Sequence, residues 1–155
     1  MLKPGNLAPD FDAETTAGGK FQLSAERGHI VVIYFFPRAF TPACNVETKG
    51  FRDNYPELHA LGVEVVGVST DPIARSCRFA EKHQVRFPMI SDGDKMISRA
   101  YGVLWPLLPM AQRVTFVIDP FGIVRGVFHH EFQISKHLDE VVKFARDLAS
   151  RTRSD

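Results

Sequence analysis

The sequence predicts one α/β domain whose mixed central sheet has helices on both faces and a hairpin at its amino end. Two continuous apolar runs, residues 30–36 and 63–69, are rich in β-branched side chains, as strands buried on both faces are. A helix-forming segment separates the two runs, which is the order of a parallel strand pair. The length of 155 residues fits one domain, so we expect a single domain over residues 1–155, with 150–155 as a frayed tail.

The amino-terminal half contains the hairpin, the central strand and a long helix. Gly28 ends a helical turn, and Pro37, which cannot donate to a sheet, ends the central strand. Pro42 suits the first turn of a helix, and Gly62 closes that helix. In order, the predicted elements are a turn at 16–20, a strand at 21–23, a helical turn capped by Ser24, the strand at 30–36, and a helix from Thr41-Pro42 to Gly62 that breaks near Pro56.

The carboxy-terminal half continues the alternation of strands and helices and closes with a second hairpin and a helix. Asp71 can cap a helix that begins with Pro72. In order, the predicted elements are the strand at 63–69, a helix from 71 to 83, an extended piece at 87–90, a helix ended by Gly102 with Met96, Ile97 and Ala100 inward, strands at 114–118 and 122–128, and an amphipathic helix at 135–149. This is the element order of a thioredoxin-like fold.

Composition excludes several classes of protein. A formal net charge of +1 with 24% charged residues argues against a nucleic-acid-binding surface. No window reaches the ~18 apolar residues of a membrane span, and residues 1–5 lack the apolar core of a signal peptide, so we expect a cytoplasmic protein without a membrane partner. Cys44 and Cys77 are too few for a disulfide scaffold and are not spaced as metal ligands, so we predict no metal and no cofactor.

Cys44 lies where the central strand gives way to a helix, and it is the candidate reactive residue. In the first turn of a helix, free backbone N–H groups and the helix dipole favour a thiolate, which is the nucleophilic form of cysteine. Thr41 supplies a hydroxyl nearby, and Pro37 and Pro42 supply rigid apolar walls that restrict water. The alternative is that Cys44 is one more buried small residue, which is the usual role of a lone cysteine.

The spacing Pro37-x-x-x-Thr41-x-x-Cys44 after an apolar strand resembles the active-site motif of the peroxiredoxins. Residues 32–53, VIYFFPRAFTPACNVETKGFRD, are similar to the peroxiredoxin Q group, also called bacterioferritin comigratory proteins. The resemblance covers nearly the whole chain, through segments in family order at 8–11, 67–69, 87–92 and 113–119. It implies a thioredoxin-like fold and a thiol-dependent peroxidase that reduces hydrogen peroxide and organic hydroperoxides, with thioredoxin or another thiol as reductant.

The resemblance also implies roles for individual residues. Cys44 would attack the peroxide O–O bond and become a sulfenic acid. Arg113 would be the active-site arginine, whose planar, always-charged group can hold both thiolate and peroxide oxygens, and Thr41 would orient the peroxide. Glu47 would help to position an arginine, although a solvated helix carboxylate is an equal alternative. A Cys-x-x-Cys redox motif is excluded, because residue 47 is not cysteine.

The chain departs from its relatives at the residue that would reduce the sulfenic acid. Many members of the group carry a second cysteine five residues after the first, where this chain has Lys49, and others carry it at the position of Ala80. Cys77 lies one turn before Ala80, so we expect both to share a helix face and Cys77 to be a possible resolving residue. The alternatives are a buried Cys77 packed with Ile73 and Ala80, and reduction by an external thiol.

Three further expectations concern the remaining features. The apolar loop 104–110 precedes Arg113 and could wall the pocket or contact a second subunit, with internal packing as the favoured alternative. His129-His130-Glu131 are expected to be polar residues at a strand end, because consecutive strand residues face opposite ways. We expect a monomer, with a weak dimer as the alternative. A non-enzymatic redox-sensing or client-binding module is the alternative to a peroxidase.

Overall fold

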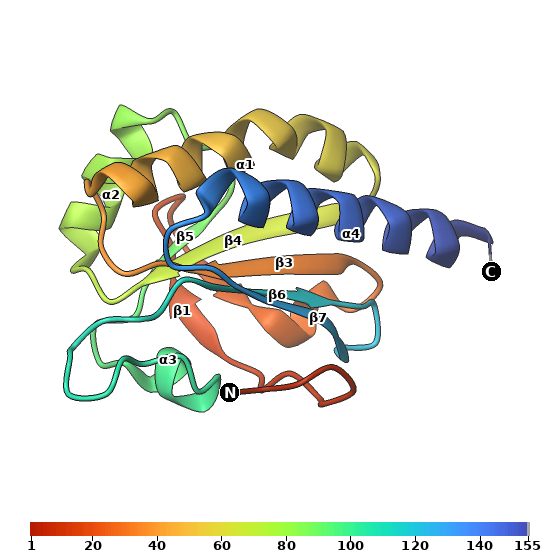
Figure 1. Ribbon diagram of the computed structural model, residues 1–155, viewed down its shortest axis with the longest axis horizontal. Coiled ribbons are helices and arrows are strands. Elements are labelled where there is room, and N and C mark those ends of the chain that lie inside the picture. The colour runs from red at the N-terminus through yellow and green to blue at the C-terminus, as the bar shows by residue number, and fades with distance from the viewer. Residues whose placement is uncertain (155) are drawn as a thin grey trace.

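A five-stranded mixed sheet forms the centre of the protein, with strand order β5-β4-β3-β6-β7 (Figure 1). The computed structural model describes residues 1–154, so Asp155 of the expected tail lies outside the described residues. β3 pairs with β4 in parallel and with β6 antiparallel, as the apolar runs predicted for the first pair. The strands are β3 (Ile30–Phe35), β4 (Val63–Ser69), β5 (Met89–Ser91), β6 (Val114–Ile118) and β7 (Val124–His129).

The predicted amino-terminal hairpin is present as a separate two-stranded sheet. It consists of β1 (Asp12–Glu14) and β2 (Lys20–Gln22), and a 3₁₀ turn η1 (Leu23–Glu26) follows. Thr15 forms an isolated antiparallel bridge with Ile90 on the edge strand β5, which ties the hairpin to the main sheet. The hairpin therefore covers a sheet edge that would otherwise offer unpaired backbone groups.

Helices cover both faces of the sheet, which confirms the thioredoxin-like arrangement. α1 (Pro42–Ala60), α2 (Ile73–Lys82) and α4 (Ile134–Ser154) lie over one face, and α3 (Met96–Ala100) lies with the hairpin on the other (Figure 1). Each face has its own apolar core, because side chains alternate along β3. Tyr34 packs toward α1, with its ring 4.4 Å from that of Phe51, and Phe35 packs toward Tyr101 on the opposite face.

Two helices differ from the prediction, one in its continuity and one in its length. The break expected near Pro56 is wrong, because α1 runs unbroken from Pro42 to Ala60. Proline removes one hydrogen bond in a helix interior, but Phe51 and Leu58 are buried on either side of it and hold the helix against the sheet. α4 continues to Ser154, beyond the expected end at residue 149, so the tail up to this point is helical. Within residues 1–154, no helix has both the length and the apolar content of a membrane span.

The inward face predicted for the helix at α3 is largely wrong. Ile97 is buried as expected, but Met96 is 66% exposed and Ala100 is also exposed. α3 has only five residues, so few of its side chains can face the sheet. Besides Ile97, the buried side chains here are Ser98 and Tyr101. The buried Asp92 carboxylate, which precedes the helix, accepts hydrogen bonds from the backbone N–H groups of Ile97 and Ser98 and so satisfies donors of the first turn.

Replacing Phe51 by alanine tests how far the core beneath α1 supports the fold. Phe51 is fully buried against Tyr34, so Phe51→Ala should lower the free energy of unfolding by about 3–5 kcal/mol through lost burial and the cavity left behind. Urea unfolding followed by circular dichroism measures the change. Phe121, at 78% exposed, is the matched control, and equal effects of Phe51→Ala and Phe121→Ala would contradict the assignment of this core.

Candidate active site

The candidate site begins where β3 ends and the chain turns into α1. Thr41 takes the N-cap position, Pro42 begins the helix, and Cys44 follows within the first turn. The Thr41 hydroxyl donates a hydrogen bond of 2.9 Å to the Arg38 carbonyl instead of capping the helix. Cys44 is 0% exposed, while Thr41 and Pro37 are half-buried beside it. Cys44 thus lies in the first turn of a helix, as predicted, and its thiol is buried there.

The loop before Cys44 is clamped by the start of α2. Asp71 accepts a hydrogen bond of 2.8 Å from the Ala39 backbone N–H, and Arg75 donates one of 2.9 Å to the Ala39 carbonyl. Asp71 and Arg75 also pair with each other, and the Arg75 guanidinium lies 5.1 Å from the centre of the Phe40 ring. Phe40 has a φ of 69°, a left-handed conformation that a non-glycine residue holds only when its surroundings fix it.

Arg113 reaches Cys44 from the neighbouring strand. Phe35 is paired with Val114 across β3 and β6, so the register places Arg113 directly beside the loop that leaves β3. Both terminal guanidinium nitrogens of Arg113, Nη1 and Nη2, lie 3.6 Å from Cys44 Sγ. The guanidinium is 3% exposed, so its charge acts on the sulfur with little screening by water.

Glu47 and Glu131 hold the Arg113 side chain in place. Arg113 Nη1 donates a hydrogen bond of 2.6 Å to Glu47 Oε1, and Arg113 Nε donates one of 3.2 Å to the Glu131 carbonyl. The Glu131 carboxylate accepts a further hydrogen bond of 3.1 Å from the Arg113 backbone N–H. Burial alone would lower the pKa of Arg113, but the charges of Glu47 and Cys44 outweigh it and raise that pKa.

Glu47 is an entirely buried carboxyl group. Cys44 and Glu47 are three residues apart and lie on the same inward face of α1, which explains why one arginine reaches both. Burial raises the pKa of Glu47 from 4.5 to about 7, and the opposing attraction of Arg113 does not cancel this effect. The alternative of a solvated helix carboxylate is therefore wrong, since Glu47 is 0% exposed.

A histidine pair lies behind Glu47, and sequence inspection did not find it. His137 on α4 is 0% exposed; its Nε2 lies 2.7 Å from Thr115 Oγ1 and its Nδ1 lies 3.0 Å from His130 Nδ1. Burial lowers the pKa of His137 to about 3, so the ring is neutral. One signal was available in the sequence, since residue 137 lies four residues before the buried Val141 on α4.

His129-His130-Glu131 lie at the end of β7, as expected, but His130 and Glu131 also contact residues of the site. The three side chains point in different directions, and those of His130 and Glu131 each reach a residue of the site. His130 contacts His137, while Glu131 holds Arg113 and accepts a contact of 2.8 Å from His129 Nε2. β7 ends at His129, so the chain after it no longer follows strand alternation and can fold back over Arg113.

Cys77 lies on α2 and is exposed. Cys77 and the more deeply buried Ala80 line one surface hollow, as expected for residues that share a helix face. The alternative of a buried Cys77 is wrong, because its side chain is exposed. Cys44 and Cys77 are both free thiols. Cys77 borders a surface hollow with Gln84 and Arg86.

The loop 104–110 is packed only at its base, where Leu104, Trp105 and Met110 are half-buried and a backbone hydrogen bond joins Trp105 to Met110, so the favoured alternative of internal packing holds in part. Leu107 and Leu108 are 103% and 51% exposed. The loop does border the active-site side of the molecule, because the Pro109 carbonyl accepts a hydrogen bond from Thr70 and Pro109 lines a hollow with Arg38 and Arg75.

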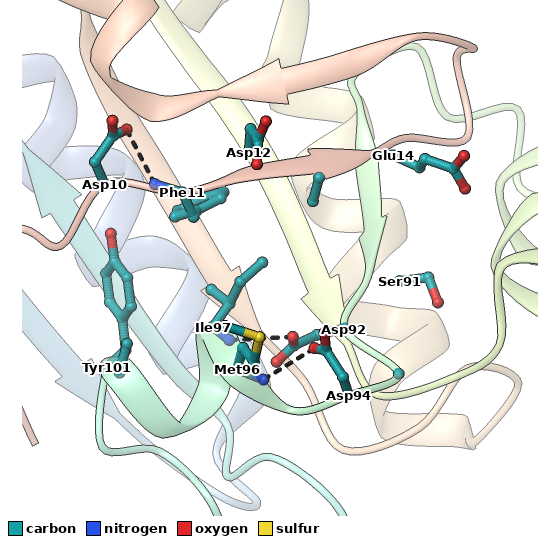
Figure 2. Close-up of a pocket in the computed structure, with 13 residues that line it drawn as sticks. Asp10, Phe11, Asp12, Glu14, Ser91, Asp92, Asp94, Met96, Ile97 and Tyr101 are labelled. Atoms are coloured by element: carbon teal, nitrogen blue, oxygen red, sulfur yellow. Dashed lines mark hydrogen bonds between the residues drawn. The ribbon is translucent and has the colours of Figure 1, made fainter.

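A hollow of about 640 Å³ lies on the opposite face of the sheet and is lined by several acidic residues. Three of these carboxylates have a structural role. Figure 2 shows Asp10, Asp92 and Asp94 with their carboxylates bonded to nearby backbone N–H groups. These carboxylates therefore serve as local caps and turn residues. In the described part of the chain, no cluster of His, Cys, Asp and Glu could hold a metal ion.

Comparison with known proteins places this geometry in one family. Residues 4–127 match the AhpC/TSA family model. The chain is 36% identical over 154 residues to peroxiredoxin Bcp of Escherichia coli, covering 96% of this chain and 98% of that protein. It is 35% identical over 150 residues to chloroplastic peroxiredoxin Q of Suaeda salsa, covering 95% of this chain and 69% of that protein.

A solved structure shows the same likeness in three dimensions. The Xanthomonas campestris bacterioferritin comigratory protein, a structure concerned with alkyl peroxide reduction, matches with a TM-score of 0.85 and 28% identity, covering 96% of this chain and 98% of that chain. Sequence and fold agree over the same span, which includes Cys44 and Arg113. The chain therefore belongs to the AhpC/TSA family, in the group of Bcp and peroxiredoxin Q proteins.

Proposed function

We propose that this thiol-dependent peroxidase uses Cys44 as its nucleophile and Arg113 as the cation that holds the reacting atoms. One observation carries the proposal: both terminal nitrogens of a buried guanidinium point at the sulfur, each at 3.6 Å. A fixed positive charge stabilises a neighbouring thiolate, and in a buried site water does not screen that attraction. The full-length peroxiredoxin relatives support the same activity.

The reaction follows from the chemistry of a thiolate and a weak O–O bond. An electron pair of the Cys44 sulfur forms the new S–O bond, and the O–O bond breaks. The leaving oxygen takes up a proton and departs as water or an alcohol. The sulfur is oxidised to a sulfenic acid while the peroxide is reduced. Negative charge moves from the sulfur to the leaving oxygen during the step. The nitrogens of Arg113 form a planar fork, so the guanidinium can stabilise this charge on the sulfur and on the leaving oxygen.

Supporting roles fit the positions of the neighbouring residues. Thr41 lies at the N-cap beside the thiol, where its hydroxyl can orient the peroxide. Pro37 is half-buried next to the loop and limits access of water. Glu47 positions Arg113 through its hydrogen bond to Nη1. Because the Xanthomonas relative is described in terms of alkyl peroxide reduction, we include organic hydroperoxides with hydrogen peroxide as substrates.

Two routes could return the sulfenic acid to a thiol. Residue 49 is a lysine, so the first route uses Cys77, and the second uses thioredoxin or another external thiol directly. A disulfide needs Cα atoms within about 7 Å, and it requires the two sulfurs to meet. Cys44 is 0% exposed and Cys77 is exposed on another helix, so the first route requires the first turn of α1 to unwind. We propose a cytoplasmic monomer for the working enzyme.

Substitution of Cys44 and Arg113 tests the proposed chemistry. Cys44→Ser should abolish peroxide reduction, and Arg113→Lys should lower the second-order rate constant on the order of 100-fold, because lysine cannot contact sulfur and peroxide as a fork. Stopped-flow kinetics with hydrogen peroxide measures both. Arg146→Lys is the matched control, since Arg146 is a surface residue paired with Glu57. A non-enzymatic sensing or binding module would instead show a rate constant near that of a free thiol in every variant.

Oxidation with one equivalent of peroxide separates the two routes of resolution. If Cys77 resolves Cys44, mass spectrometry of the digested protein should find a cross-linked Cys44–Cys77 peptide, and Cys77→Ser should lose turnover with thioredoxin. If an external thiol acts directly, Cys44 should remain trappable as a sulfenic acid and Cys77→Ser should turn over as the wild type does. Glutaredoxin and small thiols are compared in parallel, because they identify the reductant of the second route.

The buried Glu47 predicts how stability depends on pH. Burial raises its folded-state pKa to about 7 from 4.5, so between these values the folded chain keeps a proton that the unfolded chain has lost. Stability should therefore fall as pH rises through this window, by on the order of 3 kcal/mol, and Glu47→Gln should remove that fall. Urea unfolding at pH 5 and pH 8 measures it, with the exposed Glu81→Gln as control. Parallel pH curves for the wild type and Glu47→Gln would contradict the prediction.

A further inference from the structure

A line of polar contacts runs from Glu47 to the surface, and the peroxidase chemistry described above makes no use of it. Glu47 Oε2 lies 3.5 Å from His137 Nε2. His137 Nδ1 lies 3.0 Å from His130 Nδ1, and His130 Nε2 lies 3.7 Å from Glu140 Oε2. Four side chains from α1, the segment after β7 and α4 thus follow one another toward the surface, with a hydrogen bond between the two rings and longer contacts at either end.

Exposure increases steadily along this path. The side chains of Glu47 and His137 are 0% exposed, that of His130 is 20% exposed and that of Glu140 is 41% exposed. The inner end lies beside Arg113, and the outer end lies in water. Any proton that Glu47 exchanges in this direction must pass the two imidazole rings, because His137 lies between Glu47 and the solvent-facing His130.

The inner end has an oxygen that lacks a partner. Glu47 Oε1 accepts from Arg113, but among the described residues Glu47 Oε2 has no hydrogen-bond partner although it is buried. An ionised carboxylate with one unpaired buried oxygen is costly, and protonation of that oxygen relieves the cost. The contact to His137 is slightly long for a hydrogen bond, so a small movement of either side chain closes it.

The middle of the path is suited to conduct a proton without holding one. Burial keeps His137 neutral at physiological pH. A neutral imidazole carries one N–H donor and one bare acceptor nitrogen, so it can receive a proton at one nitrogen and release another from the other. Only one of the two facing Nδ1 atoms of His137 and His130 carries a proton in their 3.0 Å hydrogen bond, and either arrangement is possible.

We propose that His137 and His130 form a proton relay between Glu47 and solvent, which keeps the buried cluster of Cys44, Arg113 and Glu47 electrically neutral throughout the peroxidase reaction. The inference rests on the proposed function of Cys44. His137 and His130 act through Glu47 and touch no reacting atom, so they are positioning residues for protons and not catalytic residues.

One complete inward transfer begins and ends with both rings neutral, and it moves the N–H of each ring to its other nitrogen. A proton from water or Glu140 binds His130 Nε2, and His130 passes its Nδ1 proton to His137 Nδ1. His137 then passes its Nε2 proton to Glu47 Oε2, while the Thr115 hydroxyl at 2.7 Å stays bonded to that nitrogen in either role. Outward transfer is the same sequence in reverse.

The relay balances the charge of the reaction. Before attack, Cys44 is a thiolate, Glu47 is protonated and Arg113 is positive. The sulfur gives its electron pair to the S–O bond, the O–O bond breaks, and the leaving oxygen takes up a proton from water. As Cys44 loses its negative charge in this step, Glu47 releases its proton through His137 and His130 and balances Arg113 as a carboxylate. One proton is consumed at the leaving oxygen and one is released by Glu47.

Other titratable groups of the described residues also face Glu47 and His137. The titratable groups that face Glu47 or His137 from the elements packed around them are Cys44 on α1, Tyr34 on β3, Arg113 beside β6, His129 on β7, and His130 and Glu131 after β7. Burial raises the pKa of Tyr34 well above its ordinary value, so its hydroxyl does not release a proton in the working range.

Chemical rescue tests the relay. In a Cys77→Ser background, stopped-flow oxidation of Cys44 by hydrogen peroxide is measured at pH 7 for the parent, His130→Ala, His137→Gln and His29→Ala, with and without imidazole. His130→Ala should lower the rate constant about tenfold, which is within reach of a lost proton-transfer group, and imidazole should restore it by filling the vacated, partly exposed position. His137→Gln should be slowed as much and should not recover, because its position is sealed from solvent.

The controls separate a relay from a packing effect. His29 is a surface histidine paired with Glu26, so His29→Ala should keep the parent rate and ignore imidazole. Unchanged rate constants in His130→Ala, or a loss that imidazole does not restore, would overturn the relay while leaving the peroxidase intact. If the parent itself does not react faster than a free thiol, or if Cys44→Ser retains activity, the proposed function fails instead.

Discussion

A single buried cation organises this site. Arg113 is 3% exposed, and a guanidinium taken out of water is tolerated only where anions and hydrogen-bond acceptors surround it. Glu47, Cys44 and Glu131 provide these partners from α1 and from the segment after β7. The register of β3 against β6 is therefore constrained by function as well as by packing, since a shift of one residue would move Arg113 to the other face of the sheet.

Arg113 carries one positive charge and faces two acidic groups, Cys44 and Glu47. In a buried site, one cation cannot balance two full negative charges. Burial raises the pKa of Glu47, so its proton is held loosely near neutral pH, and the sulfur can take the negative charge in its place. The Glu47 oxygen without a hydrogen-bond partner and the neutral His137 next to it add no second positive charge to this cluster. In this cluster, the positions of protons matter as much as the positions of heavy atoms.

The burial of Cys44 limits how a reductant can reach its sulfur. Cys44 is held below the surface by a loop in which Phe40 has a left-handed backbone, and the Asp71–Arg75 pair on the far side keeps this loop closed. Such strain is offset only while the surrounding contacts remain. Opening this loop is the movement that any reductant of Cys44 requires, and the clamp on α2 lies on the same helix as the exposed Cys77.

The sequence by itself determined the fold class and the order of elements along the chain, and it singled out Cys44 as the candidate thiol, because apolar runs, prolines and the Pro37-Thr41-Cys44 spacing are local signals. Only the tertiary structure decided which polar groups share the site. Glu131 and His137 join Arg113 and Glu47 through packing of segments far apart in the chain, and no local pattern encodes that meeting. The exposure of Cys77 and the unbroken α1 were decided in the same way, since the surroundings of a helix outweigh its local propensities.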